Sequence, residues 1–290
     1  MLVSSTPATA PALGPAMIVA VLVAALLHAA WNSIAHGIGD RLVGFAMIGV
    51  VDLVAGGAIA AIAGPPPAAA WPYIVASAVV HIGYNLLLLA SYQLGEFSQA
   101  YPLARGTAPL VVALAAVVLL GRPLPAQDLA GILAVSTGLM ALVLAGGLPG
   151  RKELPAVAAA IATGLLIALY TVIDGLGVAE GPLLAYIGWM FFLQGPALPV
   201  LAVLRRGRSL PALLRRHAGT GLAGGAISLA AYSIVLWAQT SGALAPIAAL
   251  RESSIIFGAL IGALFLREPL GHRRAAAAAV VLAGVLLLSL

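Results

Sequence analysis

The sequence of 290 residues contains no cysteine and few charged side chains. The absence of cysteine excludes disulfides, iron–sulfur clusters and thiolate metal sites. Only 8% of the residues are charged, whereas soluble globular chains typically contain about 25%. Hydrophobic residues make up 62% of the chain, and its mean hydropathy is +1.11. This composition predicts a membrane protein.

Strict alternation of polar and apolar residues, which marks an outer-membrane barrel, is also absent. Apolar runs of roughly 20 residues recur instead, so the spanning elements should be helices. Such a division leaves short loops and no room for a soluble domain. Pro, Gly and charged residues between the runs predict ten spans, at about 15–36, 42–63, 71–94, 98–120, 126–147, 154–177, 182–204, 218–240, 243–266 and 272–290.

Lysine and arginine residues divide unequally between the two faces that these ten spans define. Eleven of the fourteen fall in loops on one face, many of them between 205 and 217, and Arg122 alone lies on the other. By the positive-inside rule the basic face is cytoplasmic, so we expect both termini to be periplasmic. The first span lacks the features of a signal peptide, and we expect it to be retained.

The chain shows signs of an internal duplication, because an offset of 146 residues carries Arg105 onto Arg251. The same offset aligns Gln93 with Gln239, Pro123 and Leu124 with Pro269 and Leu270, and Gly138 with Gly284. Each half, 1–147 and 154–290, would hold five spans, so the second half would enter the membrane in the opposite orientation. We therefore predict an all-α membrane protein with ten transmembrane helices, arranged as two five-helix inverted repeats.

Arg105 and Arg251 both lie within predicted spans, each about 8 residues from the start. An arginine at this depth costs at least about 2.5–3.5 kcal/mol, so it should face the interior of the bundle or a partner. Each could bind a substrate. Alternatively, each could be tied to backbone carbonyls freed by nearby prolines, and Glu252 could act as an intrahelical or cross-bundle counter-ion.

A histidine followed by an aromatic residue at +3 and an asparagine at +4 occurs twice in the chain. These three side chains share one face of a helix. Such a face suits a pocket that stacks a ring and hydrogen-bonds polar groups, although polar contacts between helices would explain it as well. The predicted substrate-binding residues are His28, Trp31, Asn32, His81, Tyr84, Asn85, Tyr101, Arg105, Tyr170, Tyr232, Trp237 and Arg251.

Two acidic residues, Asp52 and Asp174, also fall within predicted spans. Asp52 could relay a proton or pair with an arginine, and the sequence leaves both open. Gly258 and Gly262 form a GxxxG pattern, which predicts close helix packing. We recognise no catalytic constellation, phosphate loop or set of metal ligands. We therefore expect no enzymatic activity, no cofactor and no metal.

Three short motifs carry a family resemblance: HAAWN at 28–32, GRPL at 121–124 and REPL at 267–270. Together with the paired five-span halves, they resemble the drug/metabolite transporter superfamily, EamA type. Within it, the chain is similar to the bacterial inner-membrane exporters of aromatic amino acids and paraquat. The resemblance implies a central cavity between the halves and alternating access. The chain departs from the family pattern at Gly121-Arg122, where the first repeat often carries a glutamate.

The combined features predict a secondary transporter of the bacterial inner membrane that exports small metabolites, foremost amino acids including aromatic ones. Its partners would be a small-molecule substrate and membrane lipid, with no nucleic acid, and its oligomeric state stays open. The alternatives are a nucleotide-sugar or lipid-carrier transporter of the same fold, and an intramembrane enzyme. A nucleotide sugar would need several cationic side chains in the cavity. The predicted spans contain two arginines and no lysine, which disfavours that substrate.

Overall fold

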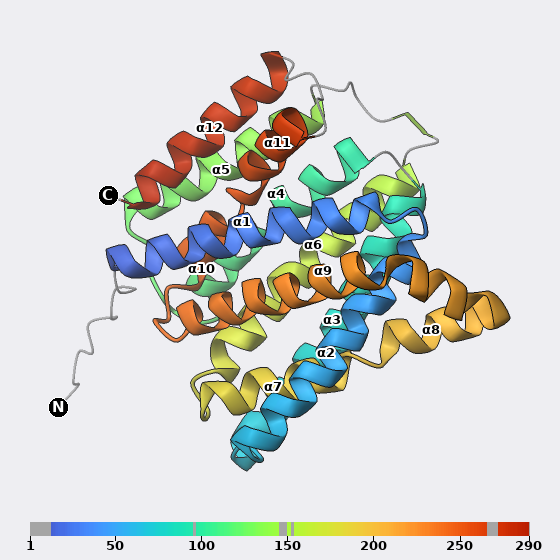
Figure 1. Ribbon diagram of the computed structural model, residues 1–290. Helices are drawn as coiled ribbons and strands as arrows, with labels where there is room; N and C mark the ends of the chain where they lie inside the picture. The colour runs from blue at the N-terminus through green and yellow to red at the C-terminus, as the bar shows by residue number, and fades with distance from the viewer. Residues whose placement is uncertain (1–12, 95–96, 145–149, 152–153, 266–271, 290) are drawn as a thin grey trace.

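The computed structural model describes residues 13–94, 97–144, 150–151, 154–265 and 272–289, and no strand occurs among them (Figure 1). Two 3₁₀ turns, η1 (Ala68–Ala70) and η2 (Gly207–Ser209), accompany the α-helices. The α-helices are α1 (Pro15–Gly37), α2 (Arg41–Ala63), α3 (Trp71–Leu94), α4 (Phe97–Val118), α5 (Ala126–Leu144), α6 (Leu154–Gly177), α7 (Leu183–Gln194), α8 (Ala197–Arg206), α9 (Leu210–Gln239), α10 (Leu244–Arg251), α11 (Ser254–Phe265) and α12 (His272–Ser289).

Five stretches of the described chain are long and apolar enough to cross a membrane. The last of them, Leu183–Gln239, contains α7, α8 and α9, and shorter apolar helices lie in α4, α5 and α12. Large apolar side chains remain on the outside, including Ile62 at 86% and Leu204 at 75% exposure. Such exposure suits contact with lipid tails, which are as apolar as leucine. The protein is therefore an all-helical membrane protein.

Three of the predicted spans differ from the observed helices. The span at 182–204 is broken between α7 and α8, where Pro196 has no N–H to continue the helical hydrogen bonds. The span at 243–266 is broken between α10 and α11, where backbone bonds become of the i to i−3 type at Glu252 and Ser253. The span predicted at 218–240 is longer in the structure. Its helix, α9, begins at Leu210 and includes arginine-rich sequence that the pattern predicts to be a loop.

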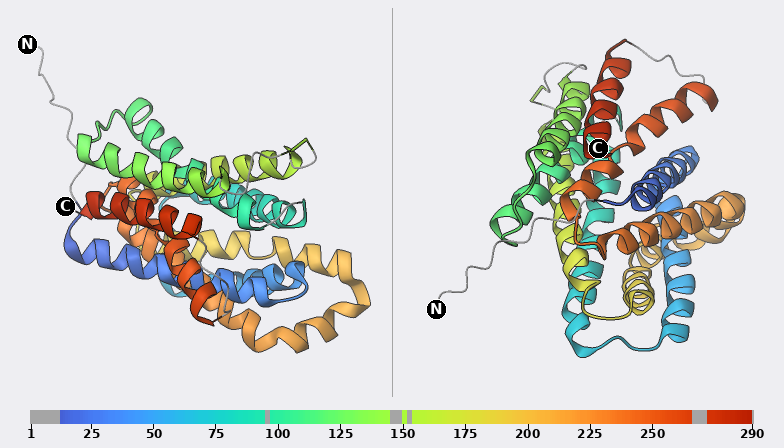
Figure 2. Two further views of the ribbon diagram at one scale, coloured as in Figure 1. Left: turned by 90° about the horizontal axis from the view of Figure 1, so that it is seen from above. Right: turned by 90° about the vertical axis from the view of Figure 1, so that its left-hand side faces the viewer.

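Helices from the first half of the chain pack against helices from the second half. The first helix, α1, packs along α9, and α6 packs along α3, while α2 pairs with α7 and α5 pairs with α12 (Figures 1 and 2). Each of these pairs joins a helix before residue 145 to a helix after residue 153. The main packing contacts are therefore made between these two parts of the chain rather than within either part.

Glycines bring the backbones of two of these pairs into contact. In the α2–α7 pair, a Cβ atom on Gly49 would lie 2.6 Å from the carbonyl oxygen of Gly195, and one on Gly188 would lie 2.5 Å from the amide nitrogen of Ala60. In the α5–α12 pair, Gly131 and Gly284 approach each other in the same way. Small residues allow this spacing in membrane helices.

The short helix α10 lies at the centre of the bundle, and all eight of its residues are buried. The following helix, α11, packs on α1 and diverges from α12 (Figure 2, right). A Cβ atom on Gly258 would meet no atom within 4 Å among the described residues. The GxxxG prediction of close packing is therefore wrong for Gly258. The surroundings of Gly262 lie outside the described part of the chain.

Candidate functional site

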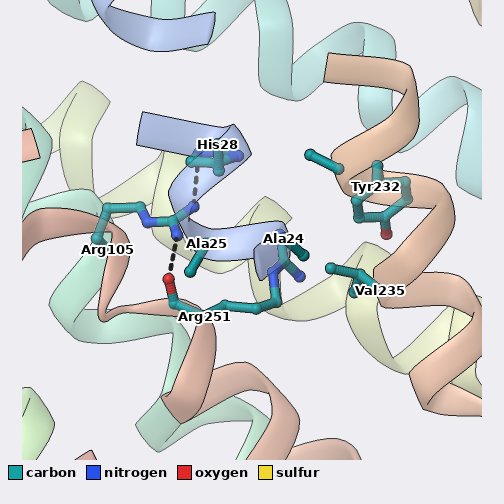
Figure 3. A pocket seen from close by; sticks show the side chains of 8 residues that line it. Ala24, Ala25, His28, Arg105, Tyr232, Val235 and Arg251 are labelled. Atoms are coloured by element: carbon teal, nitrogen blue, oxygen red, sulfur yellow. Dashed lines mark hydrogen bonds between the residues drawn. The ribbon is translucent and has the colours of Figure 1, made fainter. Parts of the chain in front are cut away.

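A small cavity lies where α1, α4, α9 and α10 meet (Figure 3). Its volume is about 10 Å³, room for roughly one water molecule. Four of the predicted binding residues line it, together with small apolar side chains. The lining consists of Ala24, Ala25, His28, Arg105, Ala231, Tyr232, Val235 and Arg251.

Arg105 is held by the break between α10 and α11. Its Nε donates to Glu252 at 2.8 Å, and its guanidinium also donates to the carbonyl oxygen of Arg251 at 3.3 Å and to Ser254 Oγ at 3.2 Å. The Arg251 carbonyl can accept because α10 ends there and leaves it without a helical partner. Glu252 is thus a cross-bundle counter-ion for Arg105. The carbonyl that accepts from Arg105 belongs to Arg251 and not to a position freed by a proline near Arg105.

Two hydrogen-bond donors lie beside the ring of His28, which can accept from only one of them. Trp31 Nε1 lies 3.2 Å from His28 Nδ1, and a guanidinium nitrogen of Arg105 lies 3.2 Å from His28 Nε2. Both neighbours are donors only, whereas a neutral imidazole has a single acceptor nitrogen. Asn32 donates to the His28 carbonyl at 2.8 Å and stays close to the site. This end of the cavity therefore has a surplus of hydrogen-bond donors, which suits an anionic group.

Arg251 has surroundings of a different kind, although it is also buried. Among the described residues, no carboxylate lies within salt-bridge distance of its guanidinium. Its Nη2 donates weakly to Tyr170 Oη at 3.4 Å, and its Cζ lies 5.4 Å from the centre of the Tyr232 ring. Phenol rings provide only modest stabilisation for a buried cation.

Aromatic rings continue from the cavity toward α3. The His81 ring stacks on Tyr170 with centroids 4.0 Å apart, and Tyr84 and Tyr232 meet Tyr170 edge-on at 5.6 and 5.7 Å. Nδ1 of His81 lies 3.0 Å from the carbonyl oxygen of Ser77, which fixes the orientation of the ring. The structure thus brings together predicted residues from α3, α6 and α9.

Asp174 belongs to this cluster, although it was not among the predicted binding residues. It is fully buried. Its Oδ1 accepts a hydrogen bond of 2.8 Å from Tyr186, and its Oδ2 accepts one from Tyr232. The sequence signal was an acidic residue inside a span, which is rare in membrane helices and marks functional sites.

The remaining predicted residues lie elsewhere. Trp237 is 43% exposed and Asn85 is half-buried, and neither lines the cavity. Tyr101 lies in α4, and its side chain is outside the described part. Asp52 accepts a hydrogen bond of 3.1 Å from Gln194 and forms no ion pair with an arginine among the described residues. No group of three metal-ligating side chains occurs among the described residues.

A second ion pair closes the end of the bundle where α2 begins and α8 ends. Arg206 donates to both oxygens of Asp40, at 2.6 and 3.0 Å, and the Asp40 carboxylate also accepts from the amide of Val43 and caps α2. The hydrogen bonds from Arg206 hold the pKa of Asp40 below its usual range. Above that pKa the pair joins two parts of the chain that are far apart in sequence.

Comparison with known proteins supports the resemblance. Residues 154–290, just under half of the chain, match the EamA-like transporter family. No curated protein matches the chain. A solved structure described as "Crystal structure of protein" superposes with a TM-score of 0.72 at 20% identity, covering 95% of this chain and 98% of its own. The chain therefore shares the fold of that structure.

Proposed function

We propose that the protein is a secondary transporter of the bacterial inner membrane that exports carboxylate-bearing small metabolites, foremost amino acids including aromatic ones. The observation that carries this proposal is the buried Arg251 guanidinium, which faces the cavity and has no carboxylate within salt-bridge distance among the described residues. A buried cation without a counter-ion is costly, and an anionic substrate group would remove that cost when it binds. The adjoining rings suit an aromatic side chain.

The packing supports two five-helix inverted repeats. Exchanging the halves would turn the pair α1 and α9 into the pair α6 and α3, and both pairs are in close contact. The same exchange maps the α2–α7 pair and the α5–α12 pair onto themselves. This is the pattern expected of a pseudo-two-fold axis that relates inverted repeats.

The ends of the bundle support the proposed orientation. The Asp40–Arg206 pair lies at the basic end. At the opposite end, Arg122 donates to the carbonyl oxygen of Gly242 at 2.8 Å, in the turn between α9 and α10. The start of α1 and the end of α12 lie on the same side as that turn (Figure 1). With the basic end in the cytoplasm, both termini would be periplasmic.

Alternating access would have to enlarge the cavity, because about 10 Å³ is far too little for an amino acid. A Cβ atom on Gly258 in α11 would meet no atom within 4 Å among the described residues, so this part of α11 has room to move. A movement of α11 would also shift Glu252, Ser254 and the Arg251 carbonyl, and all three hold Arg105. We propose that opening of the cavity and release of Arg105 accompany each other.

The test uses purified protein in proteoliposomes and counterflow of labelled tryptophan and phenylalanine. We expect exchange by the wild type and at least a tenfold higher half-saturation concentration for Arg251→Gln, because a charge-assisted hydrogen bond contributes about 1.5–3 kcal/mol. Arg251→Lys should retain part of the affinity, since it keeps the charge and loses the bidentate geometry. Arg216→Gln, the same change at an exposed position, serves as the control. Absence of amino acid exchange by folded wild type would refute the proposed substrate class.

A further inference from the structure

The buried charges of the core do not pair in the simplest way. Arg105 and Glu252 neutralise each other directly. Two other charged groups lie at or next to the cavity, the Arg251 guanidinium and the Asp174 carboxylate, and neither lies within salt-bridge distance of an opposite charge among the described residues. A further buried carboxyl, that of Asp52, does not line the cavity. The four groups Arg105, Glu252, Arg251 and Asp174 are neutral as a set, but one positive and one negative charge are kept apart.

One side chain, Tyr232, separates these two charges. Its ring faces the Arg251 guanidinium at 5.4 Å, and its hydroxyl donates to Asp174 Oδ2. Tyr232 lies on the wall of the cavity, as does Arg251 (Figure 3). A rotation of this single side chain would therefore open a path from the cavity to the carboxylate.

The other tyrosine that contacts Asp174 has a different position. Tyr186 is 1% exposed, lies in a separate apolar cluster with Ile74 and Met190, and does not line the cavity. It would continue to donate to Asp174 Oδ1 while Tyr232 moves. Asp174 thus has one oxygen held by the scaffold and one oxygen whose partner is on the cavity wall.

The charge balance identifies the class of ligand that this arrangement accepts. A zwitterion brings one positive and one negative charge, so the buried site stays neutral when it binds. If an anion bound to Arg251, the charge of Asp174 would stay uncompensated. If a cation bound to Asp174, the charge of Arg251 would stay uncompensated. Uncompensated charges in a buried site are strongly unfavourable.

We infer that Asp174 binds the ammonium group of a zwitterionic substrate whose carboxylate is bound by Arg251, with Tyr232 as the side chain that the ammonium displaces. This assignment rests on the proposed function and makes it more specific. Asp174 would then determine specificity, by distinguishing amino acids from simple carboxylic acids of the same shape.

Three indole compounds separate the two charges of the substrate. Tryptophan carries both, tryptamine lacks the carboxylate, and indole-3-propionate lacks the ammonium. In proteoliposomes, Asp174→Asn should raise the half-saturation concentration of tryptophan and tryptamine at least tenfold and leave that of indole-3-propionate unchanged or lower. Arg251→Gln should raise the values for tryptophan and indole-3-propionate and leave that for tryptamine unchanged.

Two further variants guard against general damage to the fold. Asp52→Asn makes the same change at another buried aspartate, which does not line the cavity, and should leave transport of all three compounds unchanged. Tyr232→Phe keeps the ring and removes the hydroxyl that competes for Asp174. It should therefore lower the half-saturation concentration of tryptophan and tryptamine without affecting indole-3-propionate.

The outcomes distinguish this assignment from the proposed function. Equal losses for all three compounds in Asp174→Asn would mean that Asp174 only positions its tyrosines, and would overturn the assignment while leaving amino acid transport intact. If Asp174→Asn fails to fold, an equal effect of Tyr232→Phe on all three compounds would overturn it. A wild type that exchanges none of the three would refute the proposed function itself.

Discussion

The segment of α4 around Arg105 and the junction of α10 and α11 around Arg251 align at an offset of 146 residues, yet their structures differ. Arg105 is followed by Gly106, and α4 continues without interruption. Arg251 is followed by Glu252, and the helix is broken there. The acid beside one arginine neutralises the other arginine, 147 positions away. The comparison shows how two aligned arginines can differ, one with a buried counter-ion and the other with no carboxylate within salt-bridge distance among the described residues.

The helix surfaces beside the two arginines differ in the same sense. A Cβ atom on Gly106 would lie 3.0 Å from Leu139 Cβ in α5, so α4 and α5 are in close contact. A Cβ atom on Gly258 in α11 would meet nothing within 4 Å among the described residues. Arg105 thus belongs to a helix that packs closely on its neighbour at Gly106, whereas the helix that follows Arg251 has open space at Gly258 among the described residues.

The largest effect is expected where the comparison depends on a buried charge. Glu252→Gln leaves Arg105 buried without its counter-ion and should lower the free energy of unfolding by about 3–5 kcal/mol. Thermal and chemical unfolding in detergent measure it. The double variant Arg105→Gln with Glu252→Gln should recover much of the loss, since no charge is then left unpaired. Equal stability of Glu252→Gln and the wild type would remove the distinction between the two arginines.

The packing difference gives the second prediction. Gly106→Ala should destabilise the protein by about 1–3 kcal/mol, because its Cβ atom crowds Leu139 in α5. Gly258→Ala should be neutral or stabilise by up to about 1 kcal/mol, because alanine favours the helix and the space is open. Unfolding of both variants in the same detergent checks this. Equal destabilisation would show that α11 packs as closely as α4.

A third substitution measures a buried acid that has no cation beside it. Asp52 Oδ1 and Gln194 Oε1 are both buried without a hydrogen-bond partner among the described residues. The other two polar atoms of these side chains are paired, because Gln194 Nε2 donates to Asp52 Oδ2. In Asp52→Asn the new amide can donate to the Gln194 oxygen. We expect the free energy of unfolding to rise by about 1 kcal/mol. A loss of stability like that of Glu252→Gln would contradict this account.

The smallest effect is expected at the partly exposed Asp40–Arg206 pair, which sets a scale for the buried pair of Arg105 and Glu252. Asp40→Asn keeps the helix cap and removes the attraction to Arg206, so the change should be about 0–1 kcal/mol. Because the pKa of Asp40 is lowered in the folded protein, the contribution is complete above the ordinary aspartate pKa of about 3.9. It is lost as the pH falls through the lower folded value. Melting temperatures of variant and wild type should converge in acid, and a difference that persists there would exclude the pair as its cause.

Much of the helical order could be predicted because apolar runs and their breaks are local features. Proline and glycine residues after Ala63 and before Ala126 marked the ends of helices correctly. The break after Arg251 could not be predicted in this way, because the residues there are Glu252 and Ser253 rather than proline. Arg105 hydrogen-bonds to the groups at this break, and such a contact between distant positions is not revealed by a single sequence.

Some residues of the candidate site could likewise be predicted from the sequence, and others could not. His28 and Arg105 could be recognised because polar residues in lipid-embedded helices must face the interior. Trp237 was misplaced, since a helix that is apolar on nearly every side gives little indication of which aromatic residue faces lipid. Asp174 was noticed but not assigned, because its importance depends on Tyr186 and Tyr232, which approach from two other helices.

The separation between Arg105 and Glu252 also bears on how the chain is made. The ribosome finishes Arg105 long before Glu252, and Asp52 likewise precedes Gln194 by 142 positions. The early helices must therefore enter the bilayer with polar groups whose partners do not yet exist, at about 2.5–3.5 kcal/mol for the arginine alone. The penalty for Arg105 is removed only when Glu252, at the end of α10, has been made.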